Sequence, residues 1–391
     1  MKKYLLLIVA PALSLASCSN DEVLNLNDNN EITFDVTASN NSRAANVFCN
    51  NNKPSTFNIY AKTASSTLID GDEVTVTGGT GTTVAKYYWP QTGDVNFYGI
   101  VNGKLTFSED GAAKVSSFSV NDAASAQTDL LYAVTSSSKA ASKANDGAVD
   151  INFRHALSQI VFKAKLAENA AINVKVKGVT VGAVRSSGAY TLPEATVKTD
   201  NNIAHAAASN AEYYGDNRGK WNFTDVDALK NYSITFDAVN ITTTTAVDLT
   251  PNESDKEYSS NALLLIPDAD NKTKWNTINK LTTEGKLVTD KGSFFIIDAE
   301  ITQQAKGSGE NAIEIWNGNI AVPADFSNWV EGKKYVYTFI FGKGNGGFNP
   351  DPEGPDPDPV LVQISYNVTV DEFIPADQDV EIGSETTTKT N

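Results

Sequence analysis

Short segments in which apolar and polar residues alternate recur along most of the chain. In the first of them, Ile32, Phe34 and Val36 alternate with Thr33 and Asp35. A period of two places the apolar side chains on one face of a β-strand. Similar segments lie at 57–61, 74–76, 95–97, 129–134, 149–153, 159–166, 172–176, 178–184, 233–238, 263–266, 294–301, 313–316 and 335–341. Clusters of Gly, Asn, Asp and Ser separate them, as turns between short strands require.

This spacing predicts an all-β protein with two β-sandwich domains, because many short strands without intervening helical periodicity do not build βαβ units. We place the N-terminal domain at 44–157 and the C-terminal domain at 158–341. Helical pattern is confined to an Ala-rich stretch at 203–213, inside an apparent insertion at 203–221, and to a turn at 323–330. The polar segment 136–147 is predicted to be an exposed loop.

A Pro- and Gly-rich segment at 342–359 separates these domains from one more strand, the candidate donor strand 360–373. Alternate prolines favour an extended linker and exclude a place in a sheet. One face of the strand that follows is apolar throughout: Val360, Val362, Ile364, Tyr366, Val368 and Val370. Two interpretations stay open, that the strand closes its own C-terminal sheet or that it pairs with another molecule. A polar tail at 374–391 follows it.

The N-terminus carries the features of a bacterial lipoprotein signal. Two lysines precede an apolar run of signal-peptide length, which is too short to span a membrane as a helix. Leu15-Ala16-Ser17-Cys18 resembles a lipobox, so 1–17 would be the signal peptide and Cys18 the lipidated residue. An ordinary cleaved signal that happens to contain a cysteine is the alternative. Lipid at Cys18 would attach an otherwise soluble domain to the outer membrane.

Composition excludes several classes of function. The formal charge of −16 leaves no basic footprint for nucleic acid, and two His and two Cys cannot build His- or Cys-rich metal sites. Nucleophile, nucleotide-binding and paired-carboxylate motifs do not stand out, so we predict no enzyme, no catalytic residues, no metal and no cofactor. His155 is expected to be a structural hydrogen-bonding residue, and Trp89, Trp316 and Trp329 are expected in the core.

Several short motifs occur in an order that resembles the fimbrillin-like proteins of Bacteroidetes, the type V pilin subunits. After the lipobox and Ile32-Thr33-Phe34 come Ser42-Arg43-Ala44, Tyr88-Trp89-Pro90, Asn96-Phe97-Tyr98, Asp129-Leu130-Leu131-Tyr132-Ala133, Phe153-Arg154-His155-Ala156-Leu157-Ser158, Leu264-Leu265-Ile266-Pro267 and Trp329-Val330-Glu331-Gly332-Lys333-Lys334-Tyr335-Val336-Tyr337. The resemblance implies two transthyretin-like domains. It also implies a surface protein that is exported as a lipoprotein and enters a fimbrium.

The same resemblance implies proteolytic processing between Arg43 and Ala44 by an Arg-specific surface protease. The cut would free the lipidated propeptide 18–43 with its first strand, Ile32, Phe34 and Val36, and a strand from another pilin subunit would replace it. The polar segment 39–44 suits such a cut, because proteases enter exposed loops. The alternative function is a surface-anchored lipoprotein that binds glycan or host and does not polymerise.

Overall fold

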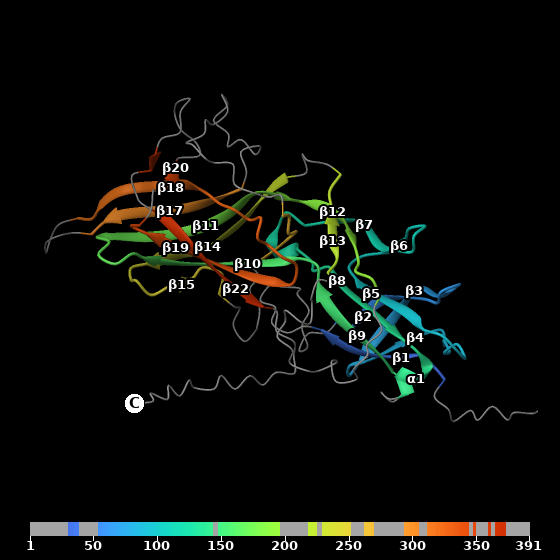
Figure 1. The fold of residues 1–391 in the computed structure, drawn as a ribbon. Coiled ribbons are helices and arrows are strands. Elements are labelled where there is room, and N and C mark those ends of the chain that lie inside the picture. The colour runs from blue at the N-terminus through green and yellow to red at the C-terminus, as the bar shows by residue number, and fades with distance from the viewer. Residues whose placement is uncertain are drawn as a thin grey trace, which may run out of the picture.

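The computed structural model describes residues 30–38, 54–143, 148–195, 218–224, 229–251, 262–269, 293–304, 311–343, 347–348, 359–360 and 364–372. Strands predominate in these residues and helix is nearly absent. Figure 1 shows two bodies of β-structure, one at the left and one at the right of the view. The predicted all-β class is therefore confirmed.

The N-terminal body is a closed barrel of seven strands, not the predicted sandwich. Its order is β1-β4-β3-β2-β5-β8-β9. The strands are β1 (Thr33–Ala38), β2 (Thr56–Lys62), β3 (Thr67–Thr77), β4 (Thr80–Thr83), β5 (Val95–Val101), β8 (Leu131–Ser137) and β9 (Ala148–His155). The barrel closes because β1 bridges β4 and β9, and it pairs with β9 in parallel. Alternation predicts six of these strands at least in part, but it predicts neither β4 nor the closure of the barrel.

A four-stranded sheet joins the two parts of the chain. It has the order β13-β12-β7-β6 and contains β6 (Leu105–Phe107), β7 (Ala113–Ser119), β12 (Ser187–Thr191) and β13 (Lys220–Asn222). β7 and β12 come from opposite sides of the predicted boundary at 157/158, and they pair with each other. The two parts therefore share one sheet.

Two further sheets build the C-terminal body. One has the order β15-β10-β19-β22, with β16 also on β10. Its strands are β10 (Ser158–Leu166), β15 (Val247–Asp248), β16 (Leu263–Leu265), β19 (Lys333–Phe341) and β22 (Ile364–Glu372). The other has the order β14-β11-β17-β18-β20-β21. Its strands are β11 (Ile172–Arg185), β14 (Leu229–Ile241), β17 (Phe294–Gln303), β18 (Ile313–Pro323), β20 (Gly347–Phe348) and β21 (Pro359–Val360). The expectation that the Pro-rich segment has no place in a sheet is therefore wrong at β20 and β21; Pro359 is the first residue of an edge strand, a position where proline is tolerated.

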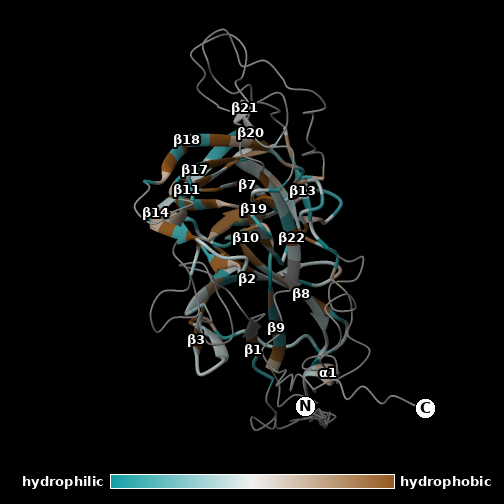
Figure 2. Cartoon of the chain, turned by 90° about the vertical axis from the view of Figure 1, so that its left-hand side faces the viewer, coloured by the Kyte–Doolittle hydropathy of each residue, from teal (hydrophilic) through white to brown (hydrophobic). Residues whose placement is uncertain are grey.

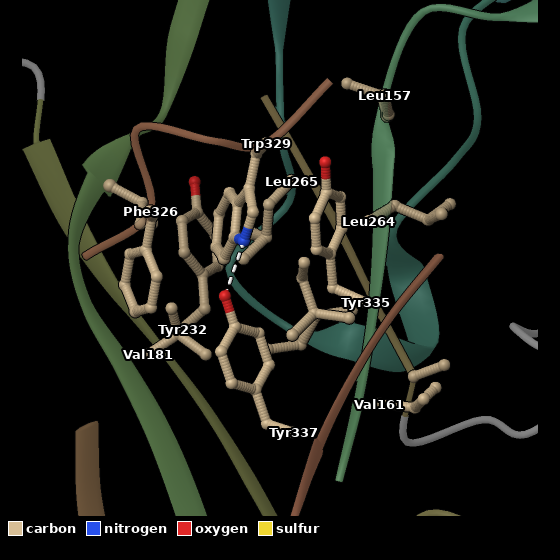
Figure 3. Packing of buried hydrophobic residues seen from close by; sticks show 14 of the residues in the cluster. Leu157, Val161, Val181, Tyr232, Leu264, Leu265, Phe326, Trp329, Tyr335 and Tyr337 are labelled. Atoms are coloured by element: carbon tan, nitrogen blue, oxygen red, sulfur yellow. Dashed lines mark hydrogen bonds between the residues drawn. The ribbon is translucent and has the colours of Figure 1, made fainter. Parts of the chain in front are cut away.

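Apolar side chains of these sheets pack into a large core that is rich in aromatic rings. Strand β9 shows the one-sided burial that alternation predicts, because its buried residues alternate with partly exposed ones along its whole length. Figure 2 shows hydrophobic and hydrophilic residues mixed along β18, where the buried residues are confined to the end of the strand. In the core shown in Figure 3, Trp329 stacks on Phe326 with 4.4 Å between ring centroids, and its indole N–H donates to the Tyr337 hydroxyl at 2.8 Å. Trp89 and Trp329 are buried as predicted, whereas Trp316 is only partly buried.

Helix is scarce in the described parts of the chain. A five-residue helix, α1 (Lys139–Lys143), lies in the segment predicted as a loop, and a 3₁₀ turn, η1, covers Ala124–Ala126. The turn of helix predicted at 323–330 is irregular in the structure, and the Ala-rich stretch 203–213 lies outside the described residues. None of the described helices has the length and apolar character needed to cross a membrane.

Candidate strand-exchange site

The first strand is hydrogen-bonded along both of its edges. On one edge β1 pairs with β9 from Thr33 opposite Ala148 to Ala38 opposite Phe153. On the other edge it pairs with β4, and the amide N–H of Val36 donates to the carbonyl oxygen of Gly79 at 2.8 Å. We call this position between β4 and β9 the β1 site. Loss of β1 would leave two unpaired strand edges.

Two side chains of β1, together with that of Ile32 just before it, fill the barrel interior. Ile32 is 3% exposed, and Phe34 and Val36 are fully buried. The Phe34 ring packs edge-on against Phe57 and Phe97, with centroid distances of 6.3 and 6.2 Å. At ~1.5–3 kcal/mol for each buried apolar side chain, the three supply roughly 5–9 kcal/mol before ordering costs. The β1 site is therefore an apolar site, and a strand bound in it stabilises the barrel.

A glycine on β4 sets how closely the occupying strand approaches. Gly81 lies opposite Phe34, and a Cβ built on it would lie 2.7 Å from a methyl group of Val74. The same Cβ would lie 3.2 Å from Phe34 Cβ and from Val36 Cγ2. Only glycine leaves room for both β1 side chains, and the sequence pattern did not single it out.

The predicted processing site lies in the segment that follows β1. β1 ends at Ala38 and β2 begins at Thr56, so Arg43 and Ala44 fall between them, outside the described residues. Cys18 also lies outside them. All the other strands of the barrel follow Arg43 in the chain. A cut at Arg43 would therefore break the covalent connection between β1 and these strands.

Part of the predicted donor strand is described in the structure as β22. β22 begins at Ile364, whereas Val360 belongs to the two-residue strand β21 of another sheet, and Val362 lies outside the described residues. Within β22, Ile364 is 3% exposed, Tyr366 is partly buried and Val368 is 45% exposed. Val370 lies in the strand, but the structure describes only its backbone.

In the isolated chain β22 closes its own sheet. It runs antiparallel to β19 from Ile364 opposite Phe341 to Glu372 opposite Lys333, and it is the outermost strand of its sheet. Tyr366 packs on Phe295 and Tyr337, with centroid distances of 5.4 and 5.8 Å. Of the two interpretations that the sequence left open, the isolated chain adopts the one in which the strand closes its own sheet. The core of the C-terminal body therefore extends beyond Phe341 and includes Ile364.

A buried carboxyl group connects the N- and C-terminal parts. Glu331 accepts hydrogen bonds from the hydroxyls of Tyr132, at 2.7 Å, and Tyr190, at 2.5 Å. Burial raises the pKa of Glu331 above its ordinary value, although the two tyrosines and Arg218 act against that rise. Glu331 lies within one of the motifs that carry the resemblance, but nothing in that motif marks it as buried.

Neither His155 nor the nearby cavity offers obvious chemistry. The Nδ1 atom of buried His155 hydrogen-bonds the Asp129 carboxylate, which is the structural role predicted for it. A cavity of about 310 Å³ is lined by residues that include Trp221, Trp329 and Glu331. Trp221 is only 9% exposed and Trp329 only 4%, so neither presents an open aromatic face to a sugar. No group of acidic, His or Cys side chains suited to a metal occurs in the described parts of the chain.

Comparison with known proteins finds no curated protein that matches the sequence. Among solved structures, a fimbrial protein from Bacteroides vulgatus aligns with a TM-score of 0.49 and 14% identity, covering 87% of this chain and 99% of that one. A fimbrial assembly protein from Parabacteroides distasonis aligns with a TM-score of 0.36 and 7% identity, covering 87% and 98%. We base no functional argument on these distant structural likenesses.

The family comparison covers most of the chain. The model of the family described as fimbrillin-like matches residues 42–351, which include every strand from β2 to β20. The match begins just before Arg43 and ends within the Pro-rich segment, so β1 and β22 lie outside it. On this match, the chain belongs to the fimbrillin-like family.

Proposed function

We propose that this protein is a structural fimbrial subunit, exported as a lipoprotein, cleaved after Arg43 and polymerised by donor-strand exchange, with a role in adhesion. The observation that carries the proposal is the position of β1. It closes the barrel, yet it is the only described barrel strand on the N-terminal side of Arg43. Membership of the fimbrillin-like family supports the same function.

Cleavage would change how β1 is held without removing its contacts. Before the cut, β1 is tethered to β2 and its return to the barrel is intramolecular. After the cut, a departing β1 gains translational freedom, and a competing strand can take its place. The roughly 5–9 kcal/mol of apolar burial favours an occupied site over an empty one. Processing at Arg43 and Ala44 would therefore permit exchange.

The strand that enters would come from another pilin subunit, and β22 is our candidate. Among the described strands β22 has one neighbour, so it can leave its sheet at the expense of a single ladder. The Pro-rich segment 342–359 connects it to the sheets and contains the short strand β20 and the start of β21, which would also detach for the segment to extend fully. At ~3.1 Å per residue, an extended proline-rich linker of this length reaches roughly 55 Å. Such a linker can span to a neighbouring molecule.

The other parts of the proposal follow from the signal sequence. Lipid at Cys18 would hold the uncleaved precursor on the outer membrane, where an Arg-specific surface protease acts on it. Cleavage then moves the subunit from the lipid anchor to the fimbrium. We assign no catalytic role to the protein and no cofactor.

Protein recovered from cells tests the proposal. The fibre fraction should begin at Ala44, and the membrane fraction should retain a lipidated Cys18. Arg43→Ala should leave the protein lipidated and abolish its fibres in electron micrographs, whereas Cys18→Ala should block labelling by a radioactive fatty acid. A surface protein that keeps Cys18, never begins at Ala44 and forms no fibres would favour the anchored binding lipoprotein instead.

A further inference from the structure

Seven consecutive residues of the last strand repeat the first strand position by position. Residues 32–38 read Ile-Thr-Phe-Asp-Val-Thr-Ala, and residues 364–370 read Ile-Ser-Tyr-Asn-Val-Thr-Val. Three positions are identical. The other four keep the kind of side chain, with Ser for Thr, Tyr for Phe, Asn for Asp and Val for Ala. Each segment forms a strand in the structure.

The side chains at the first and third positions point toward the core in both segments. Ile32 and Ile364 are each 3% exposed, and the aromatic residue two positions later packs against other aromatic rings in both places. The residues at the second and fourth positions lie on the other face. A shift of one residue would turn every side chain to the wrong face, so the repeat defines one register.

The repeated pattern is better accommodated at the β1 site than on β19. Val36 is fully buried, whereas the matching Val368 is 45% exposed. β1 pairs with strands on both edges, whereas β22 pairs only with β19 among the described strands. Transfer of residues 364–370 to the β1 site would therefore bury more apolar surface and add a second ladder of hydrogen bonds.

The repeat also keeps a polar side chain on the outer face at its fourth position. Asp35 of β1 stands in register beside Asp150 of β9. Asn367 has the position of Asp35 in the repeat, so an incoming β22 would place its amide side chain beside Asp150.

The short distance between Gly81 and the side chains of β1 also favours the residues of the repeat at this site. Val36 Cγ2 would lie 3.2 Å from a Cβ at position 81, so the space there fits a β-branched side chain against a bare glycine. Val368 supplies the same side chain at the matching position. The aromatic residue two positions earlier differs only by the hydroxyl of Tyr366.

Part of the pattern occurs a third time, in a strand that does not meet these conditions. Residues 234–237 of β14 read Ile-Thr-Phe-Asp, but Ala238 replaces the valine at the fifth position. β14 is also joined at its two ends to segments that lead to β13 and β15, so it cannot leave its sheet alone. The full repeat is therefore confined to β1 and β22.

We propose that residues 364–370 of a second copy of this chain replace residues 32–38 at the β1 site in the same direction and register, with Ile364, Tyr366 and Val368 in the places of Ile32, Phe34 and Val36. The subunit is then complementary to itself, and the assembly is a polymer of one chain. The inference rests on the proposed function, since the β1 site opens only after cleavage at Arg43.

Cross-linking between differently substituted subunits tests the register. In a Cys49→Ser background, subunits with Asn367→Cys are mixed with subunits carrying Asp150→Cys, and an Arg-specific protease cleaves both. Asn367 should lie where Asp35 lies, beside Asp150, so a short thiol cross-linker should join two chains. Acceptors with Ala148→Cys or Asn152→Cys, each two residues away on the same face, are the matched controls and should react at least ~fivefold less.

The possible outcomes distinguish the proposed register from the proposed fimbrial function. Preferred cross-linking of position 367 to 150 between chains, dependent on cleavage, supports the inference. Polymers that cross-link better through 148 or 152, or that require a different chain as donor, overturn it and leave the proposed function standing. A doubly substituted subunit that cross-links only within itself and stays monomeric overturns it too. Processed wild-type subunits that never polymerise overturn both the inference and the proposed function.

Discussion

At the β1 site Val36 is fully buried and its strand is hydrogen-bonded on both edges. On β19 the corresponding Val368 is 45% exposed, and its strand has one neighbour among the strands that the structure describes. Nearly the same seven residues thus occupy a complete position in the barrel and an incomplete position at the margin of a sheet. The comparison indicates that the pattern of side chains in a strand determines which sites it can fit. The covalent connections of the chain determine which of these sites it occupies before cleavage. In the uncleaved chain β1 is present, and β22 takes the available edge of β19.

The largest expected effect comes from a charge at position 368. Val368→Asp leaves the carboxylate largely in water on β19, so the free energy of unfolding of the monomer should change by less than about 1 kcal/mol. At the β1 site the same carboxylate would be buried at a cost of several kcal/mol, which weakens polymerisation at least ~100-fold. Thermal unfolding of the uncleaved subunit and light scattering after cleavage measure the two effects.

Thr369→Asp is the control for that variant, because Thr369 is exposed and lies on the opposite face of β22. It should polymerise nearly as well as the wild-type protein. Equal polymerisation of the Val368→Asp and Thr369→Asp subunits would show that this face of β22 is not buried in the polymer.

Phe34→Ala should weaken the first strand in its own site. Removing the ring leaves a cavity against Phe57 and Phe97, and truncations of buried Phe cost ~3–5 kcal/mol. Denaturant unfolding of the uncleaved subunit should show that loss, and the cleaved subunit should polymerise faster because β1 leaves more readily. Asp35→Ala, at the exposed neighbouring position, should not lower stability. A cleaved Phe34→Ala subunit that polymerises more slowly than wild type would argue against release of β1 as the controlling step.

Tyr366→Phe should increase the preference of residues 364–370 for the β1 site over β19. On β19 burial raises the pKa of Tyr366, and a backbone hydrogen bond at Asp325 satisfies its hydroxyl. At the β1 site the ring would occupy the fully buried place of Phe34, where an unpaired hydroxyl costs about 1–3 kcal/mol. The critical concentration for polymerisation should therefore fall, by about tenfold for each 1.4 kcal/mol. A higher critical concentration would contradict this placement of Tyr366.

The smallest effect concerns Glu331, which belongs to neither β1 nor β22. Its pKa is raised from the ordinary value of 4.5, so its favourable contribution to stability is present below that value and declines as pH rises through the folded-state pKa. Glu331→Gln keeps an oxygen acceptor for Tyr132 and Tyr190 without the charge. Relative to this variant, the wild-type melting temperature should fall as pH increases above about 4.5, and a difference independent of pH would contradict the assignment.

Alternation along the chain predicted many of the strands and the buried face of β1, because these depend on local periodicity. It missed β4, β6, β7, β12 and β13, and on β22 Val368 is 45% exposed although it lies on the predicted apolar face. It did not predict the barrel, since closure depends on β1 meeting β9, which is more than a hundred residues later in the chain. It also missed Gly81 and the burial of Glu331. The reason is that both depend on atoms from distant strands: Val74 and Val36 around the glycine, and Tyr132 and Tyr190 around the carboxyl group.

The central claim is that β1 leaves the barrel when another strand enters, and the fate of the cleaved N-terminal peptide tests it most directly. Purified precursor is cleaved at Arg43, and mass spectrometry follows the peptide that ends at Arg43 in the monomer, polymer and free fractions. The account predicts that cleaved monomers retain the peptide and that polymers lack it, with its release matching the rate of polymer growth. Polymers that retain a full complement of the peptide at the β1 site would contradict the account.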